Sequence, residues 1–214
     1  EDFTADELYD AVLRLADEGV DNIDFITAGH YAARLLPVLE RLKKRVTVPF
    51  IYNSGGYENV NVIRALDGLI DVYLPDFKYA SPELADKMSG AADYPSVATA
   101  AIDEMCRQRG EYREENGLAK SGVIIRHLVL PGHRDDSKAA LRVIAERWRT
   151  AKVSVMRQYT PEFNRSPYPE LNRRITSFEY DDVVKEAIRL GLDGFIQEKG
   201  CETADFTPDF NKIY

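Results

Sequence analysis

The sequence predicts an α/β fold of parallel strands that alternate with helices, as in a partial (βα) barrel that lacks its first strand. Short apolar runs are separated by stretches with the 3.6-residue apolar period of helices. These runs are apolar throughout, which is typical of parallel strands covered on both faces. Polar and Gly-rich residues follow directly after the runs. We expect about five or six βα units in one domain over residues 1–214, although a doubly wound sheet also fits.

The first half of the chain is expected to supply three of the strands. Thr4, with Glu7 three residues later, has the pattern of a capping box that begins a helix ending at Gly19. The elements expected next are a strand over Ile23–Thr27, a helix over Ala32–Lys44, a strand over Val46–Tyr52, a helix over Val60–Leu66 and a strand over Leu69–Leu74.

The second half continues the alternation with longer helices. Gly110–Gly122 is polar and charged and is predicted to be an irregular, exposed excursion. Residues 160–214 are predicted to form an irregular C-terminal extension with one helix. The regular elements expected here are helices over Ser81–Met88, Tyr94–Arg109, Lys138–Trp148 and Tyr180–Leu190, and strands over Val123–Leu130, Lys152–Met156 and Phe195–Gln197.

Composition excludes several classes of protein. The formal net charge of −8 argues against a nucleic-acid-binding domain, which usually has a basic face. No apolar run approaches the 18 residues of a membrane span, so we expect no membrane partner. Cys106 and Cys201 lie too far apart for a disulfide framework or a metal-ligand cluster, and they suit a reducing, cytoplasmic location.

The start of the sequence has its own implication. The chain begins at Glu1 rather than Met and has no signal-peptide pattern. We therefore expect it to be a piece of a longer protein or a chain trimmed at its N-terminus.

The candidate site residues follow the predicted strands, where the sites of parallel α/β folds lie. Asp76 and Lys78 point to the same side of an extended segment and could bind a zwitterion or a ribose hydroxyl, but a solvated pair is the commoner explanation. Arg126 or His127 must face the interior of the sheet, and a buried Arg126 needs a partner such as Asp76. An internal ion pair and a ligand site both explain this pattern.

Three further strand ends carry candidates of weaker specificity. Each also has a structural explanation: a histidine that caps the next helix, a plain turn, and a surface turn, respectively. The candidates are Thr27 and His30 after the first predicted strand, Asn53 and Ser54 in the Gly-rich segment Asn53–Tyr57, and Gln158 and Tyr159 after Lys152–Met156.

Read in order, these segments resemble the radical S-adenosylmethionine family, and more narrowly the proteins related to pyruvate formate-lyase activating enzyme. The resemblance covers roughly residues 4–163. Leu74–Tyr79 and Arg126–Gly132 are specific in combination, and the other segments that carry it are Ile26–Tyr31, Tyr52–Tyr57 and Val155–Tyr159.

The resemblance implies a six-unit partial barrel and an oxidoreductase that splits S-adenosylmethionine reductively with a 4Fe–4S cluster held by three cysteines. The resulting 5′-deoxyadenosyl radical abstracts hydrogen from a substrate. It also implies cofactor-binding roles, with Lys78 and Asp76 near the methionine carboxylate and ribose, and Arg126 as a basic residue on the fifth strand. The remaining residues that match cofactor-binding positions are Thr27, His30, Asn53, Ser54, Gln158 and Tyr159. Implied partners are a glycyl-radical-type protein or a small molecule as substrate, and flavodoxin or ferredoxin as electron donor.

The sequence departs from this family at the cluster motif. No Cys-x-x-x-Cys-x-x-Cys loop is present, and Thr27–His30 lacks the usual Gly-Gly-Glu. We expect the first strand and the cluster loop to lie upstream of Glu1, so that this chain alone binds no metal and is inactive. A homologue that has lost its cluster is the other explanation. The alternative functions are a non-catalytic ligand-binding or scaffold domain and, less favoured, a barrel hydrolase or aldolase using Lys78.

Overall fold

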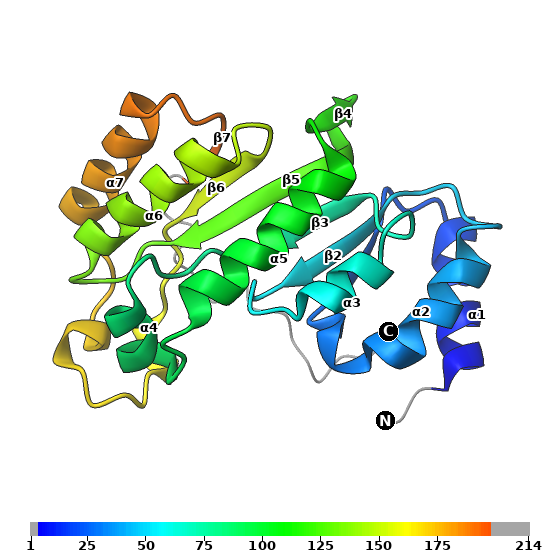
Figure 1. The fold of residues 1–214 in the computed structure, drawn as a ribbon, viewed down its shortest axis with the longest axis horizontal. Coiled ribbons are helices and arrows are strands. Elements are labelled where there is room, and N and C mark those ends of the chain that lie inside the picture. The colour runs from blue at the N-terminus through cyan, green and yellow to red at the C-terminus, as the bar shows by residue number, and fades with distance from the viewer. Residues whose placement is uncertain (1–3, 198–214) are drawn as a thin grey trace.

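The fold is a curved sheet of mainly parallel strands with helices along its outer side. The computed structural model describes residues 4–197 (Figure 1). The strands pair in the order β1-β2-β3-β5-β6-β7, and β4 pairs with β5 as a side branch. Every pair on the main path is parallel, whereas β4 and β5 are antiparallel. Because the order never reverses, the sheet has the sequential topology of a barrel rather than that of a doubly wound fold. The strands are β1 (Ile23–Ile26), β2 (Phe50–Ser54), β3 (Val72–Pro75), β4 (Arg113–Glu115), β5 (Leu118–Leu128), β6 (Lys152–Met156) and β7 (Gly194–Ile196).

The helices begin where the sequence supplies caps. The capping box predicted at Thr4 and Glu7 is confirmed, and a second one joins Thr176 to Glu179. Ser81 accepts a hydrogen bond from the Leu84 N–H and so starts the helix after β3. The helices are α1 (Ala5–Asp17), α2 (Ala32–Leu42), α3 (Val60–Ala65), α4 (Pro82–Ser89), α5 (Tyr94–Arg109), α6 (Arg134–Arg147) and α7 (Ser177–Arg189), with short 3₁₀ turns η1 (Ala28–Tyr31), η2 (Pro161–Phe163) and η3 (Pro169–Asn172).

Several predicted elements have other bounds in the structure, and two segments show the reasons. The strand expected over Val46–Tyr52 starts only at Phe50 and includes Asn53 and Ser54, because Asn53 pairs with both β1 and β3 and Ser54 pairs with β3. The prediction of an irregular excursion over Gly110–Gly122 is wrong, since it contains the hairpin of β4 and the start of β5. Asn116 and Gly117 both have positive φ angles, 53° and 78°, as a tight hairpin turn requires.

The C-terminal extension is described only in part. The loop expected over Thr160–Ser177 carries η2 and η3, and α7 is the predicted single helix. Residues 198–214 of that extension, including Cys201, lie outside the described residues.

The hydrophobic core lies between the sheet and its outer helices. Phe77 packs edge-to-face on Trp148, with ring centroids 5.3 Å apart, and both side chains are almost fully buried. Tyr52 and Tyr73 on neighbouring strands are also completely buried. These buried side chains pack the strands against the outer helices, and the opposite face of the sheet carries polar side chains.

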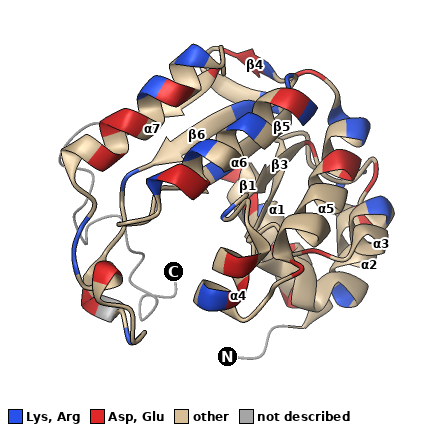
Figure 2. Cartoon of the chain, turned by 60° about the vertical axis from the view of Figure 1, so that its left-hand side comes forward, with Lys and Arg blue, Asp and Glu red and all other residues tan. Residues whose placement is uncertain are grey.

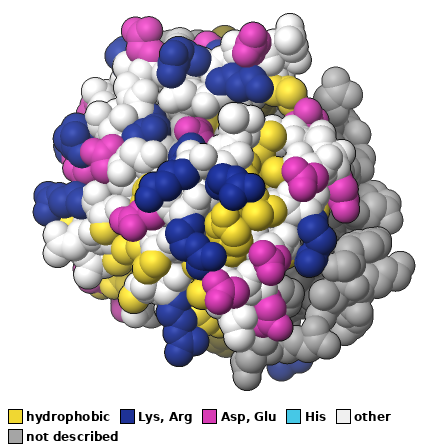
Figure 3. Space-filling view, turned by 90° about the vertical axis from the view of Figure 1, so that its right-hand side faces the viewer, with side chains coloured by type: hydrophobic (Ala, Val, Ile, Leu, Met, Phe, Trp, Pro, Cys, Tyr) yellow, Lys and Arg dark blue, Asp and Glu magenta, His cyan; other side chains and the backbone are white. Residues whose placement is uncertain are grey.

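The first strand has a free edge. Along the described sheet β1 pairs only with β2, and Ile26 is 65% exposed. A groove of about 990 Å³ runs beside β1 and is walled by the start of α1, by η1 and by α2. Figure 3 views the side of the molecule on which α1 and α2 lie, where apolar side chains gather between Lys and Arg residues. The groove is lined by Thr4, Ala5, Leu8, Asp24, Phe25, Ile26, Ala28, Tyr31, Arg34, Leu35, Pro37 and Val38.

The outer surface has mixed charge. Lys and Arg alternate with Asp and Glu along the helices (Figure 2), and many of them form ion pairs such as Arg142 with Glu186. None of the helices in residues 4–197 combines the length and the apolar character that a bilayer crossing requires.

Candidate functional site

Polar side chains from four neighbouring strands gather on the inner face of the sheet, opposite the core. In β1 the alternation of burial directs Ile23 and Phe25 toward the helices and Asp24 toward the inner face. The same alternation and the contacts described below place Asn53 from β2, Asp76 after β3 and Arg126 from β5 on that face. These four residues form a polar row that crosses the sheet near its carboxyl edge.

Asp76 is the centre of this row. Its carboxylate accepts hydrogen bonds from Arg126 Nε at 2.8 Å and from Lys78 Nζ at 2.7 Å. Arg126 NH2 also lies 2.8 Å from the same carboxylate. The Asp76 side chain is only 11% exposed, compared with 24% for Arg126 and 42% for Lys78. One carboxylate therefore balances two cations, and the three residues together carry a net positive charge.

The backbone explains why Asp76 and Arg126 meet although 50 residues separate them. The two residues form an isolated parallel bridge. The Asp76 N–H donates to the Ser54 carbonyl, and the next N–H, that of Phe77, donates to the Arg126 carbonyl. The segment after β3 is thus fixed between β2 and β5, and the ion pair follows from this register.

Asp24 is a site residue that sequence reasoning missed. Asn53 Nδ2 donates to the Asp24 carboxylate at 3.2 Å. The Asp24 side chain is exposed at the surface, but partial desolvation by the surrounding atoms raises its pKa, while the hydrogen bond from Asn53 and the charge of Arg126 act in the opposite direction. Its signal in the sequence is a single carboxylate in the middle of an otherwise apolar strand, Ile23–Ile26. The structure thereby adds a second carboxylate to the inner face.

The residues after β1 lie at the same edge in an unusual backbone conformation. Thr27 has φ 54° and ψ 34°, a left-handed conformation that is rare for a β-branched residue, and its N–H donates to the Asn53 carbonyl. His30 lies in η1 and is exposed. It faces the charge of Glu58. Burial raises the pKa of Glu58, and hydrogen bonds from Tyr52 and Ser54 and the charge of His30 offset part of this rise.

Not every predicted residue reaches the inner face. Ser54 is buried on the helix side, where its hydroxyl accepts a hydrogen bond from the Gly56 N–H. Gln158 follows β6 at the same edge and is partly buried. Tyr159 donates from its hydroxyl to the Leu171 carbonyl at 2.9 Å, so it holds the 160–175 segment. The structure brings Asn53, Asp76, Lys78 and Arg126 together and gives Ser54 and Tyr159 structural contacts.

His127 and Arg126 take opposite sides of β5, as the sequence requires. His127 is fully buried, and its Nδ1 lies 2.7 Å from the Phe77 carbonyl. Burial lowers the pKa of His127, which favours a neutral ring. The contact of His127 with Phe77 lies on the helix side of the sheet and stabilises the segment that carries Asp76.

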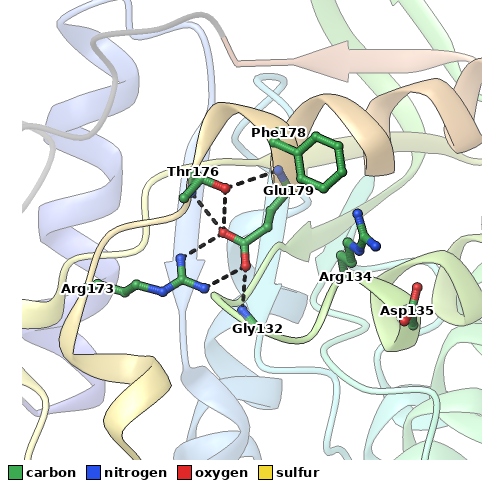
Figure 4. A pocket seen from close by; sticks show the side chains of 7 residues that line it. All are labelled: Gly132, Arg134, Asp135, Arg173, Thr176, Phe178 and Glu179. Atoms are coloured by element: carbon green, nitrogen blue, oxygen red, sulfur yellow. Dashed lines mark hydrogen bonds and ion pairs between the residues drawn. The ribbon is translucent and has the colours of Figure 1, made fainter.

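A second, shallower pocket of about 340 Å³ lies beyond the carboxyl end of β5 (Figure 4). Glu179 from α7 dominates it, because its carboxylate accepts two hydrogen bonds from Arg173 and one from the Gly132 N–H. The pKa of Glu179 is lowered chiefly by the Arg173 guanidinium. These hydrogen bonds already satisfy the Glu179 carboxylate. We therefore interpret the pocket as a packing contact between α7 and the loop after β5.

The described residues do not fit an iron–sulfur cluster. Among residues 4–197 no group of three or more His, Cys, Asp or Glu side chains is arranged to hold a metal ion. Cys106 lies in α5, and burial raises the pKa of its thiol to about 12, which opposes the thiolate that a cluster needs.

Comparison with known proteins identifies the fold. No protein-family model matches the chain. An uncharacterized protein of Methanocaldococcus jannaschii is 32% identical over 174 residues, a match covering 80% of this chain and 47% of that protein. The chain thus spans about half the length of the curated relative that it matches.

The solved structures that resemble the chain share its architecture at low sequence identity. A domain of pyruvate-formate lyase-activating enzyme from Bacteroides vulgatus has a TM-score of 0.59 at 10% identity, over 83% of this chain and 98% of that one. A radical SAM methyltransferase from Sphaerobacter thermophilus has 0.65 at 12%, over 94% and 60%. Methylornithine synthase (PylB) has 0.53 at 13%, over 99% and 68%. The expected partial-barrel fold of radical SAM proteins is confirmed.

Proposed function

We propose that this chain is the S-adenosylmethionine-binding part of a radical S-adenosylmethionine enzyme related to the activating enzymes of glycyl-radical proteins. The observation that carries the proposal is the polar row of Asp24, Asn53, Asp76 and Arg126, with Lys78 beside it, at the carboxyl edge of a sequential parallel sheet. The site combines two cations, Lys78 and Arg126, with two carboxylates, Asp76 and Asp24, and the more exposed Lys78 suits the carboxylate of a methionine group.

The roles of these residues differ in the proposed complex. Lys78 is the more exposed cation and is free to turn toward a ligand carboxylate while Arg126 keeps Asp76 in place. Asn53 and Asp24 offer hydrogen-bonding groups to a ligand amine or hydroxyl on the same face. Thr27, His30, Gln158 and Tyr159 stay in the proposal as residues of the surrounding rim.

The proposal separates ligand binding from cluster binding. In an enzyme of this kind the 4Fe–4S cluster supplies the electron that cleaves the sulfonium bond. Because the described residues cannot hold it, we propose that the ligands lie in a longer protein and that this chain alone is inactive. The free edge of β1 and the groove beside it support pairing with a further strand from a segment that precedes Glu1, since Thr4 itself lines the groove.

Partners and location follow from the same proposal. A radical enzyme of this type needs a hydrogen donor, here a glycyl-radical-type protein or a small molecule, and an electron donor such as flavodoxin or ferredoxin. The two widely spaced cysteines support a cytoplasmic location for the protein. An oxygen-sensitive cluster would also require the reducing conditions of that compartment.

The test begins with binding. Calorimetry should detect S-adenosylmethionine binding to the chain, and Lys78→Ala should weaken it about tenfold or more, the loss expected for a charge-assisted contact. Lys44→Ala is the matched control, because Lys44 lies at the end of α2 away from the row. Equal affinity of the two variants would contradict the assigned role of Lys78.

The enzyme claim needs the longer gene. Its upstream region should encode three cysteines in the family spacing, and the protein reconstituted without oxygen should release 5′-deoxyadenosine from S-adenosylmethionine when it is reduced. A complete gene without these cysteines would remove the claim of radical chemistry and leave only that of binding.

One observation favours a second candidate, a non-catalytic scaffold or ligand-binding domain. Arg126 of the row and Lys78 beside it both already pair with Asp76, as in an internal ion network. In that case Lys78→Ala would lower the stability of the chain without affecting any ligand. Absence of S-adenosylmethionine binding by both the wild-type chain and the reconstituted longer protein would select this candidate.

A further inference from the structure

Tyr94 connects the loop after β2 with the segment after β3 that carries Asp76 and Lys78. It is the first residue of α5, is preceded by the cap residue Asp93, and is only 3% exposed. Helix α5 packs against β3 and β5, so the position of this side chain is set by the core rather than by a loop.

The phenolic oxygen of Tyr94 contacts three backbone groups. It accepts a hydrogen bond from the Lys78 N–H at 3.0 Å. It also lies 2.9 Å from the Asp76 carbonyl and 3.0 Å from the Gly55 carbonyl, which share its single proton. One buried hydroxyl therefore joins the loop after β2 to the segment after β3.

The two loops are in close contact at this point. Gly56 has φ +79°, and a Cβ added there would lie 2.0 Å from the Asp76 carbonyl oxygen. The Tyr57 ring stacks on Tyr94 at 6.0 Å with an interplanar angle of 8°, and its hydroxyl donates to Asp93. The Tyr94 hydroxyl thus lies at a close approach of the two loops, and a side chain at Gly56 would collide with the Asp76 carbonyl.

The chemistry of the phenol suits a permanent connection. Burial raises the pKa of Tyr94, so the hydroxyl stays protonated and acts as donor and acceptor together. Without it, the Lys78 N–H and the two carbonyls would lack this partner in a buried region, which is costly.

We propose that Tyr94 is a positioning residue, which holds Asn53 and the Asp76–Lys78 pair at the spacing that ligand binding requires. This inference rests on the proposed function for the identity of the ligand, but the link between the loops is a property of the chain itself.

The experiment compares Tyr94→Phe with Tyr79→Phe in the whole chain. Tyr79 is the matched control because it is also a buried tyrosine and touches the Tyr94 ring edge-on at 5.4 Å, yet its hydroxyl bonds to Ser89 instead of the row. Affinity for S-adenosylmethionine, measured by calorimetry, should fall about fivefold to tenfold in Tyr94→Phe and less than about twofold in Tyr79→Phe. Equal affinities in the two variants would overturn the inference.

A second measurement needs no ligand. Amide hydrogen exchange should accelerate about tenfold or more at Gly56 and Lys78 in Tyr94→Phe, with the amides in the middle of β5 unchanged. Exchange that stays at the wild-type rate, or that rises equally throughout the sheet, would overturn the positioning role. If neither the wild-type chain nor the reconstituted longer protein binds S-adenosylmethionine, the proposed function fails, and the exchange result alone decides the role of Tyr94.

Discussion

Replacing Asp76 by Asn tests the electrostatic centre of the candidate site. The substitution keeps the shape of the side chain but removes the charge that faces Arg126 and Lys78. The two cations then face each other without a carboxylate between them, and the new amide group presents its own N–H donors to one of them. We expect a marked loss of stability with little change of fold.

The magnitude follows from the exposure of each partner. Removing one partner from a buried ion pair costs about 3–5 kcal/mol, whereas exposed pairs contribute about 0–1 kcal/mol. The Arg126 pair, at 24% and 11% exposure, lies between these limits at about 2 kcal/mol. The Lys78 pair, with its cation 42% exposed, adds less than about 1 kcal/mol. The sum of about 2–3 kcal/mol corresponds to a fall in Tm of roughly 5–10 °C for a domain of this size.

Urea unfolding at about pH 7 measures this difference, with Asp6→Asn as control. Asp6 pairs with Arg41 at the surface, where the two side chains are 80% and 49% exposed, so its loss should be below about 0.5 kcal/mol. If Asp76→Asn unfolds at the same urea concentration as Asp6→Asn, the row is not the electrostatic centre that the geometry indicates.

Three further predictions concern pH and backbone strain. Desolvation raises the pKa of Asp24, so its carboxyl group binds a proton more tightly in the folded state than in the unfolded state. The free energy of unfolding should therefore fall as pH rises above the usual pKa of 3.8. Asp24→Asn should remove this fall in unfolding titrations from about pH 3 to about pH 7. The pKa of Glu179 is lowered, so its stabilising effect is present above 4.5 and is lost progressively as pH falls from 4.5 through the lowered folded pKa. Glu179→Gln should cost about 1–2 kcal/mol near pH 7 and measurably less near pH 3, and an equal loss at both would contradict the assignment. Gly56→Ala should cost at least about 1 kcal/mol more than Gly68→Ala by urea unfolding, because both glycines have φ near +80° but only Gly56 meets another atom, the Asp76 oxygen; equal costs would refute the close contact.

Local signals in the sequence predicted most of the helices. The limits of α5 match the expected Tyr94–Arg109, and the capping box at Thr4 begins α1 as expected. Such features depend on residues within one or two turns of each other, so one sequence contains the information. The hairpin at Asn116 and Gly117 was not predicted, although Asn-Gly is a local turn signal. The many charged residues of Gly110–Gly122 favoured an irregular loop instead.

The candidate site was predictable only in part, because it depends on strand register. The pairing of Asp76 with Arg126 was expected as one of two explanations, and the structure shows that the ion pair exists. The neighbour of Asn53 could not be predicted, since Asp24 reaches it only through the parallel pairing of Ile26 with Asn53. Asp24, the polar residue of β1, thus acquires its hydrogen-bond partner from a strand 29 residues away in sequence.

The free edge of β1 and the polar row are parts of the same surface. Asp24 belongs to both, because it lines the groove beside the edge and accepts a hydrogen bond from Asn53. A strand that paired with β1 would cover the groove and further bury this carboxylate, which would raise its pKa beyond the present shift. The edge partner would therefore change the charge of the site as well as its shape. For this reason, the pH dependence of ligand affinity should differ between the isolated chain and a longer protein, and Asp24→Asn, which has no carboxylate to titrate, should reduce that difference in calorimetric titrations.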